Sequence, residues 1–305
     1  MAPISIWPPM HADRLISYYF PELGVRAAWA RLEHADERLH ALSHAPKQAQ
    51  DWLTQCACAA ALFTSGIKLN GKLSIQLRSQ GALRQIFAEC SSLGYLRGIA
   101  RADSETQTPF PSEFNVACAR GSAAITIEPE QGERYQGIVG LSVDGIAATF
   151  EEYFNSSEQL PTRIVLANGA QNTTGILIQR VAQVGGDQAP LDQDGWARIE
   201  NLLATLKPDE LAAINEDTLM HRLFHEENYV QTKEQTLTHH CPCSRERVAA
   251  MLQSIGHDEA LAAANESGFA QIQCEFCNAD YRFDRVDIEK LFHLATAVAG
   301  SAVLQ

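Results

Sequence analysis

The hydrophobic pattern of the N-terminal part of the chain predicts more strands than helices. Residues 73–78, Leu-Ser-Ile-Gln-Leu-Arg, alternate apolar and polar side chains, which is typical of a half-buried strand. Similar apolar or alternating runs predict six more strands, at residues 83–90, 96–100, 123–127, 135–143, 163–167 and 175–181. Because these strands cluster along the chain, we expect an α+β fold with a mainly antiparallel sheet rather than a doubly wound parallel one.

Three helices are predicted in the same part of the chain. Residues 22–43 carry apolar side chains at helical spacing among charged ones. A second, Ala-rich helix from about Ala49 to Ile67 follows Pro46, and glycines mark its end. A third is expected at residues 146–156.

The character of the chain changes after Gly185-Gly186. Between Asp187 and His240 there are eleven acidic residues against four basic ones, a net charge of −7 out of −13 for the whole chain. Apolar side chains still recur at helical spacing, at Trp196, Ile199, Leu203, Leu206, Leu211, Ile214, Leu219 and Leu223. Two interpretations stay open. The helices cap the N-terminal part, or they form a marginally stable linker, since a thin apolar stripe buries little and acidic charges repel one another.

A small unit is predicted at residues 241–305. Ser244 is a natural N-cap for a helix that ends near Gly256, and a second short helix spans about Glu259 to Asn265. A turn around Cys274 and a helix at residues 287–294 follow. We therefore expect three parts: an N-terminal α+β domain at residues 1–184, an acidic helical linker at 185–240, and a small C-terminal domain at 241–305.

Four cysteines in this last unit form two close pairs, Cys241-Pro-Cys243 and Cys274-Glu-Phe-Cys277. Two thiolate pairs brought together by an intervening helical segment make the tetrahedral four-thiolate site that Zn²⁺ prefers. A unit of this size with few large apolar side chains usually needs such a cross-link to fold. His239 and His240 lie beside the first pair, so a site of three cysteines and one histidine is an alternative. Thiolates are also what oxidants attack, so the site can sense redox state.

Composition and charge limit the classes of function that the protein can have. A net charge of −13 over 305 residues disfavours nucleic acid as the main partner. The N-terminal residues lack the apolar core of a secretory signal, and no apolar run is long enough to span a bilayer, so we expect a cytoplasmic protein with no membrane partner. The sequence contains no phosphate-binding or hydrolase motif, which indicates a non-enzyme without ATP dependence. The other four cysteines, Cys56, Cys58, Cys90 and Cys118, are interpreted as small buried hydrophobic residues.

Taken together, these segments resemble the heat-shock protein 33 family, the bacterial redox-regulated 33 kDa chaperonins. The similarity covers nearly the whole chain. It is carried by the cysteine segments with Ser244-Arg-Glu246 and Tyr281-Arg-Phe283, and in the N-terminal part by Gly71–Leu77, Leu96–Gly98, Tyr135–Val139, Glu152–Phe154, Ser157–Thr162 and, further on, Arg222–Phe224.

The resemblance implies a chaperone that holds unfolding clients without ATP under oxidative stress. It implies that Cys241, Cys243, Cys274 and Cys277 bind one Zn²⁺ in the reduced, inactive protein. Oxidation would join Cys241 to Cys243 and Cys274 to Cys277, release zinc and unfold the linker. The resemblance also implies a homodimer of the active form. The alternative is a constitutive zinc-ribbon interaction or adaptor protein.

Overall fold

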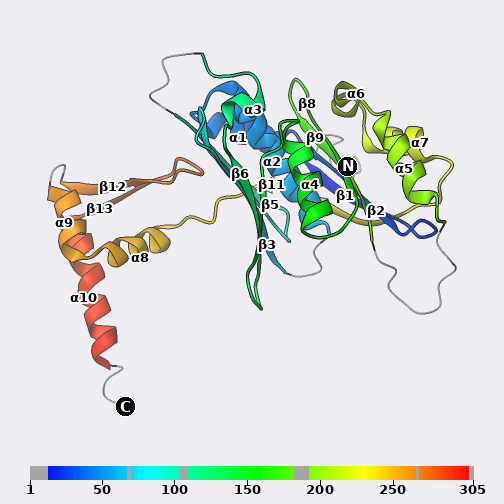
Figure 1. Ribbon diagram of the computed structural model, residues 1–305. Coiled ribbons are helices and arrows are strands. Elements are labelled where there is room, and N and C mark those ends of the chain that lie inside the picture. Colours follow the sequence, from blue (N-terminus) through cyan, green and yellow to red (C-terminus); the bar gives the residue numbers. More distant parts are fainter. Residues whose placement is uncertain (1–12, 67–69, 104–108, 182–191, 266–267, 302–305) are drawn as a thin grey trace, which may run out of the picture. The chain divides into compact units, whose positions relative to one another are not determined.

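A computed structural model of the chain describes residues 13–66, 70–103, 109–181, 192–265 and 268–301, with side chains up to His293 (Figure 1). It divides into two compact units, Met1–His240 and Cys241–Gln305. The predicted α+β class is confirmed, because both units combine helices with antiparallel strands. The predicted domain boundary after residue 184 falls outside the described residues.

The first unit contains two sheets. The five-stranded sheet is formed by β1 (Arg14–Phe20), β2 (Val25–Leu32), β8 (Thr162–Asn168), β9 (Thr173–Arg180) and β10 (Val230–Thr236), in the order β10-β1-β2-β9-β8. The six-stranded sheet is formed by β3 (Gly71–Arg78), β4 (Leu83–Ser91), β5 (Tyr95–Ala102), β6 (Ser122–Pro129), β7 (Tyr135–Gly140) and β11 (Thr238–His239), in the order β11-β5-β4-β3-β6-β7. Only the pairing of β11 with β5 is parallel among the described strands. The seven predicted strands are confirmed as β3 to β9.

Helix α2 (Lys47–Thr64) lies between the two sheets and contacts strands of both (Figure 1). Its residues from Ala57 to Leu62 are fully buried, as expected of a helix that is apolar on every face. Close packing is possible because β9 has Gly175 opposite the helix, where a Cβ atom would lie 2.9 Å from Cys58 Sγ. Among the described residues, no helix is long and apolar enough to cross a membrane.

The predicted helix at residues 22–43 is wrong in its first half. Residues Val25–Leu32 form β2, and only His34–Leu42 are helical, as α1. The reason is that β2 is buried on both faces: Ala28 and Ala30 face α2, while Val25 and Trp29 belong to a second core. A strand covered on both sides has no polar alternation, so its alanine-rich sequence resembles a helix. Helices α3 (Phe114–Ala117) and α4 (Ile146–Ser156) complete this part, and α4 agrees with the prediction.

The acidic segment forms α5 (Gly195–Ala204), α6 (Pro208–Ala213) and α7 (Glu216–Phe224), followed by the unpredicted strands β10 and β11. These helices cover the face of the five-stranded sheet that points away from α2 (Figure 1). Ile199, Leu211, Leu219 and Phe224 are fully buried there. The expectation of a thin, little-buried stripe is therefore wrong, because the sheet face supplies an apolar partner surface. The alternative interpretation, helices that cap the N-terminal part, describes the structure.

The second unit is small. It contains α8 (Arg245–Ile255), α9 (His257–Asn265), the hairpin of β12 (Phe269–Gln273) and β13 (Asp280–Asp284), and α10 (Arg285–Ser301). Among its described side chains, the buried apolar residues are Leu252, Ala260, Ala264, Ala270, Phe283 and Ile288. Half of them are alanines, so this core removes little apolar surface from water.

Candidate metal centre

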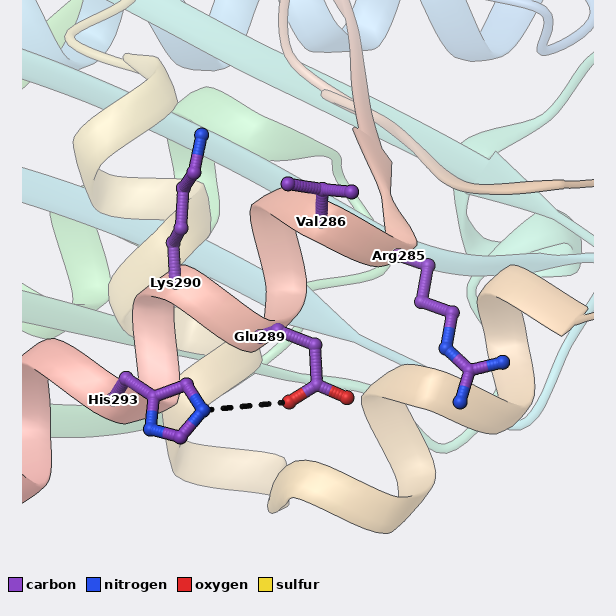
Figure 2. Close-up of a pocket in the computed structure, with 5 residues that line it drawn as sticks. All are labelled: Arg285, Val286, Glu289, Lys290 and His293. Atoms are coloured by element: carbon purple, nitrogen blue, oxygen red, sulfur yellow. Dashed lines mark ion pairs between the residues drawn. The ribbon is translucent and has the colours of Figure 1, made fainter.

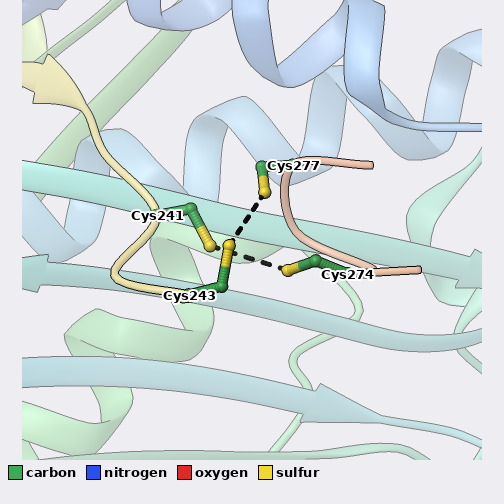
Figure 3. Close-up of side chains that lie close together, drawn as sticks. All are labelled: Cys241, Cys243, Cys274 and Cys277. Atoms are coloured by element: carbon green, nitrogen blue, oxygen red, sulfur yellow. Dashed lines mark hydrogen bonds between the residues drawn. The ribbon is translucent and has the colours of Figure 1, made fainter. Parts of the chain in front are cut away.

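The four cysteines of the second unit converge from two loops (Figure 3). Cys241 and Cys243 lie in the extended segment that leads into α8, and Cys274 and Cys277 lie in the loop of the β12–β13 hairpin. Their Sγ atoms all lie within 4.8 Å of one another. In the described part of the chain, this is the only group of histidine, cysteine or acidic side chains close enough together to hold a metal ion.

The spacing of the sulfur atoms fits a tetrahedral ion. Cys241 Sγ is 3.7 Å from Cys274 Sγ, and Cys243 Sγ is 3.3 Å from Cys277 Sγ. Four sulfurs about 2.3 Å from a central Zn²⁺ would be roughly 3.8 Å apart. Both close contacts join a sulfur atom of the first cysteine pair to one of the second, at distances near the edge length of such a tetrahedron. Four soft, half-buried donors without a carboxylate suit Zn²⁺ better than Mg²⁺ or Ca²⁺.

Backbone hydrogen bonds fix the loop that carries the second pair. The amide of Cys274 donates to the carbonyl oxygen of Ala279 at 2.9 Å, and the amide of Asn278 donates to the carbonyl oxygen of Cys274 at 2.7 Å. Asn278 adopts the left-handed conformation with φ of 57°, which asparagine tolerates better than most residues. The loop thus positions both thiols through its own backbone.

The contacts of Cys243 favour its thiolate form. Burial raises its pKa, but the Tyr281 hydroxyl, which donates to Cys243 Sγ at 3.1 Å, and the neighbouring thiols together lower the pKa to about 7. The residue also precedes the N-cap of α8, where the helix dipole favours negative charge. By contrast, burial raises the pKa of Cys241 and of Cys277. Sequence reasoning did not assign this role to Tyr281; its position four residues after Cys277 was the available signal.

Arg245 joins the two halves of the centre. Its guanidinium donates to the carbonyl oxygen of Arg282 and forms an ion pair with Asp287, both at 2.7 Å, and it lies 4.1 Å from the centre of the Phe283 ring. Ser244 caps the same helix by accepting from the amide of Arg247. The start of α8, β13 and α10 are thereby held together beside the cysteines.

The two histidines considered as alternative ligands lie in the first unit. His239 pairs with Leu96 in the β11–β5 ladder. The amide of His240 donates to the carbonyl oxygen of Leu96 at 2.8 Å, and its ring lies 4.6 Å from that of Tyr95. The group of potential ligands contains neither of them.

The remaining cysteines are confirmed as buried apolar residues. Cys56, Cys58, Cys90 and Cys118 are all buried and free. Burial raises the pKa of each thiol, to about 12 for Cys90 and Cys118. These thiols therefore stay protonated and unreactive at neutral pH.

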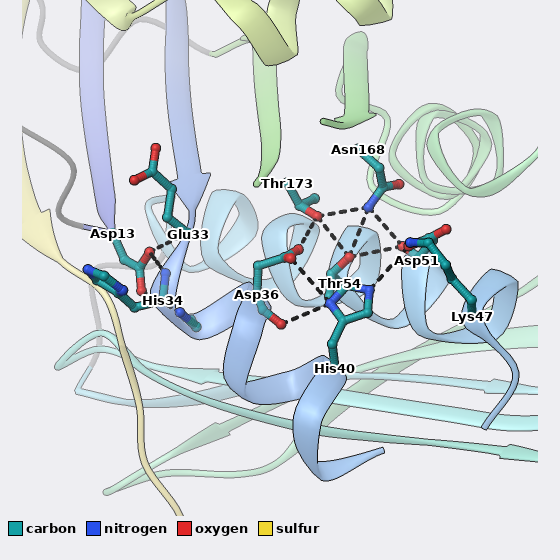
Figure 4. Close-up of polar contacts among 11 residues, drawn as sticks. Asp13, Glu33, His34, Asp36, His40, Lys47, Asp51, Thr54, Asn168 and Thr173 are labelled. Carbon is teal, nitrogen blue, oxygen red and sulfur yellow. Dashed lines mark hydrogen bonds and ion pairs between the residues drawn. The ribbon is translucent and has the colours of Figure 1, made fainter. Parts of the chain in front are cut away.

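A polar network in the first unit joins α1 to α2, β8 and β9 (Figure 4). His40 lies between two carboxylates, with its ring nitrogens 3.2 Å from Asp36 and 3.1 Å from Asp51. The hydrogen bond to Asp36, helped by Asp51 and opposed by burial, raises the pKa of His40 to about 9. Thr173 donates to Asp36 at 2.6 Å. Because its buried groups are paired, this network is interpreted as structural.

A hollow on α10 in the second unit carries no comparable chemistry. Figure 2 shows Glu289 and His293 pointing toward one another, while Lys290 and Arg285 point elsewhere. It adjoins the part of α10 whose side chains lie outside the described residues. The cysteine centre is therefore the candidate functional site.

Comparisons with known proteins agree over nearly the whole chain. The model of the Hsp33 protein family matches residues 13–284. The 33 kDa chaperonin of Ectopseudomonas mendocina is 38% identical over 285 residues, which cover 93% of this chain and 96% of that protein. The 33 kDa chaperonin of Hahella chejuensis is 36% identical over 287 residues, covering 94% and 99%. The crystal structure of the 33 kDa chaperonin from Thermotoga maritima matches with a TM-score of 0.80 over 94% of this chain and all of that one; at 20% identity this likeness shows the fold.

Proposed function

The chain belongs to the Hsp33 family, and from this premise we propose that it is a redox-regulated molecular chaperone that holds unfolding proteins without ATP. The observation that carries the proposal is the group of four cysteines, together with an acidic helical segment that covers an apolar sheet face. The relatives are named 33 kDa chaperonin, which supports the chaperone class. We place the activity in the cytoplasm under oxidative stress, where the thiols start out reduced.

In the resting state, Cys241, Cys243, Cys274 and Cys277 would hold one Zn²⁺. Bound there, the ion supplies a cross-link between the start of α8 and the hairpin loop, the structural role of zinc in small domains. The surrounding protein groups orient the thiols and stabilise a thiolate. The loop backbone orients Cys274 and Cys277, and Tyr281 stabilises the thiolate of Cys243.

Oxidation removes the donors. In our proposal Cys241 and Cys243 lose two electrons to one peroxide, their Sγ–Sγ bond forms, and the peroxide leaves as two waters with two protons taken from the thiols or solvent. A second peroxide does the same for Cys274 and Cys277. All four Sγ atoms lie within 4.8 Å of one another, so each bond needs only small loop movements. In our proposal the core that remains, of whose six described buried residues half are alanine, is too small to keep the unit folded.

The acidic segment is the element that would unfold after oxidation of the cysteines. Its last backbone anchors are Leu237 to Asp13, Thr238 to Gly94 and His240 to Leu96, and the last of these comes directly before Cys241. Unfolding of the second unit removes the ordered structure that follows these anchors. The net charge of −7 between Asp187 and His240 then favours an expanded chain through self-repulsion.

Departure of α5–α7 would uncover an apolar face of the five-stranded sheet. The side chains now buried beneath the helices are Ile16, Tyr18, Phe20, Val25, Trp29, Ile176 and Ile178. A surface of this kind binds exposed apolar segments of unfolding clients without needing a specific sequence. We also propose that the active form is a homodimer through the first unit, where Ile138 on the edge strand β7 is 65% exposed.

The test is to treat the reduced, zinc-loaded protein with peroxide at mild heat, following zinc release with a chelating dye and client aggregation by light scattering. We expect both to change together, and Cys118→Ala, at a buried cysteine outside the centre, to behave like the unmodified protein. If zinc stays bound, or leaves without any gain in holding activity, the switch is refuted. The first outcome, zinc that stays bound under peroxide, would favour a constitutive zinc-ribbon adaptor.

A further inference from the structure

The first unit contains a cavity of about 310 Å³ that the cysteine switch does not use. Its apolar walls come from Phe63 of α2, Ile125 and Ile127 of β6, and Phe154 and Leu160 at and after the end of α4. Several of these residues lie in the segments Glu152–Phe154 and Ser157–Thr162, which carry family resemblance but have no part in the metal centre. The volume is in the range of small-molecule sites.

Arg26 of β2 borders this cavity and has no carboxylate partner among the described residues. Its Nε donates to Gln179 Oε1 at 2.9 Å and its Nη1 donates to Ser65 Oγ at 3.2 Å, both neutral groups. Nη2 has no hydrogen-bond partner within the described part of the chain. A half-buried guanidinium with neutral partners keeps a positive charge that an anion could neutralise.

The surroundings hold this guanidinium in place. Gln179 is oriented by its own hydrogen bond to Thr162 Oγ1 at 2.8 Å, so that its oxygen faces Arg26. Gly66 lies flush against the guanidinium: a Cβ atom there would be 2.4 Å from both terminal nitrogens. Arg26 is therefore positioned before any ligand arrives, which reduces the entropy lost on binding. Burial lowers its pKa to about 10, which leaves it charged at neutral pH.

Glu158 also lines the cavity and limits the charge that a ligand can carry. Its Oε1 accepts hydrogen bonds from the hydroxyls of Tyr135 at 2.8 Å and Tyr153 at 2.6 Å. This carboxylate already has its donors within the protein and would repel a second negative group. The cavity lining thus includes one cation, one internally bonded anion and several apolar side chains.

We propose that this cavity binds a small monocarboxylate with an apolar body, such as a medium-chain fatty acid. The carboxylate pairs with Arg26, and the hydrocarbon packs against Phe63, Ile127 and Phe154. The proposal is independent of the cysteine switch, because every residue it uses lies in the first unit.

The first test uses the unmodified, reduced full-length chain and isothermal titration calorimetry. Octanoate is the probe, compared with neutral octanamide, cationic octylammonium and the dicarboxylate suberate. Because the proposed contact is a charge-assisted hydrogen bond, octanoate should bind at least about tenfold more tightly than each of the others. Equal binding of octanoate and octanamide would overturn the proposal, since it would show apolar adsorption only, and so would no binding of octanoate.

The second test uses two matched arginine variants. R26Q removes the charge in the cavity, and R180Q removes an exposed charge one residue beyond Gln179 on the same strand. With folding checked by circular dichroism, R26Q should weaken octanoate binding about tenfold or more, and R180Q should leave it unchanged. Equal loss in both variants would refute a role for Arg26. If R26Q fails to fold, the ligand series on the unmodified chain decides.

Discussion

The two units of the molecule are stabilised in different ways. The first has a helix enclosed between two sheets and a second core beneath α5–α7, with Trp29, Phe20, Phe150 and Phe224 among its fully buried side chains. The second has six buried apolar residues among those described, together with four converging thiols. The first unit has a large apolar core, whereas in the proposed mechanism the second unit depends on what joins its cysteines. A chain built in this way would lose the second unit on oxidation and keep the first.

The largest effect is expected from removing a cysteine of the centre. Cys277→Ser should unfold the second unit, because a structural zinc site contributes on the order of 10 kcal/mol to such modules. Amide hydrogen exchange should show loss of protection in α8 and β12–β13 while α2 stays protected. Cys90→Ala, in the first unit, serves as the control. Retained protection of α8 in Cys277→Ser would show that the second unit does not need the cross-link.

The next prediction concerns the packing of α5–α7 against the five-stranded sheet. Phe224 packs edge-on against Phe20 with ring centres 5.4 Å apart and is fully buried. Phe224→Ala should destabilise the docked α7 by about 3–5 kcal/mol, as for other large-to-small core changes.

Hydrogen exchange of α5–α7 should then rise in the reduced protein, and holding activity should appear without peroxide. Val116→Ala, at a side chain that is 55% exposed, is the matched control and should change neither property. Faster exchange with no holding activity would show that release of α5–α7 is not sufficient for client binding.

A smaller effect is expected from pH in the first unit. The pKa of His40 is raised from its ordinary value of 6.5 to about 9 by Asp36 and Asp51. The folded state therefore binds a proton that the unfolded chain releases above pH 6.5. Its contribution, about 1–3 kcal/mol, is fully present below pH 6.5 and is lost as the pH rises through 9.

Urea unfolding of the first unit between pH 6 and 10 measures this contribution. His40→Gln should flatten the decline, while His44→Gln, near the same helix, should keep it. An unchanged slope in His40→Gln would assign the pH dependence to other groups.

The smallest effect is expected at Tyr281. Tyr281→Phe removes the hydroxyl that donates to Cys243 Sγ but keeps the ring. Loss of such an outer hydrogen bond to a metal ligand typically weakens metal binding by about tenfold. Competition with a chelator measures the zinc affinity, and Tyr95→Phe in the first unit is the control. Equal affinity in both variants would show that the hydroxyl does not support the centre.

Sequence reasoning located most of the fold and the whole cysteine group. The strands β3–β9 and the helices α2, α4 and α8 follow from local alternation, caps and glycines, because these signals act over a few residues. It failed at Val25–Leu32, where burial on both faces removed the alternation that marks a strand. It also missed β10, whose residues are nearly all exposed and whose conformation depends on pairing with β1.

By itself, the sequence identified the four cysteines of the candidate metal centre, because they form two close pairs in a unit with few large apolar side chains. It also determined the excess of negative charge between Asp187 and His240. Only the tertiary structure decided what the acidic helices cover and that Tyr281 supports Cys243. It alone also placed Arg26 beside a cavity, with no carboxylate partner among the residues that the structure describes. These contacts join residues from different elements, and local sequence patterns carry no information about which surfaces meet.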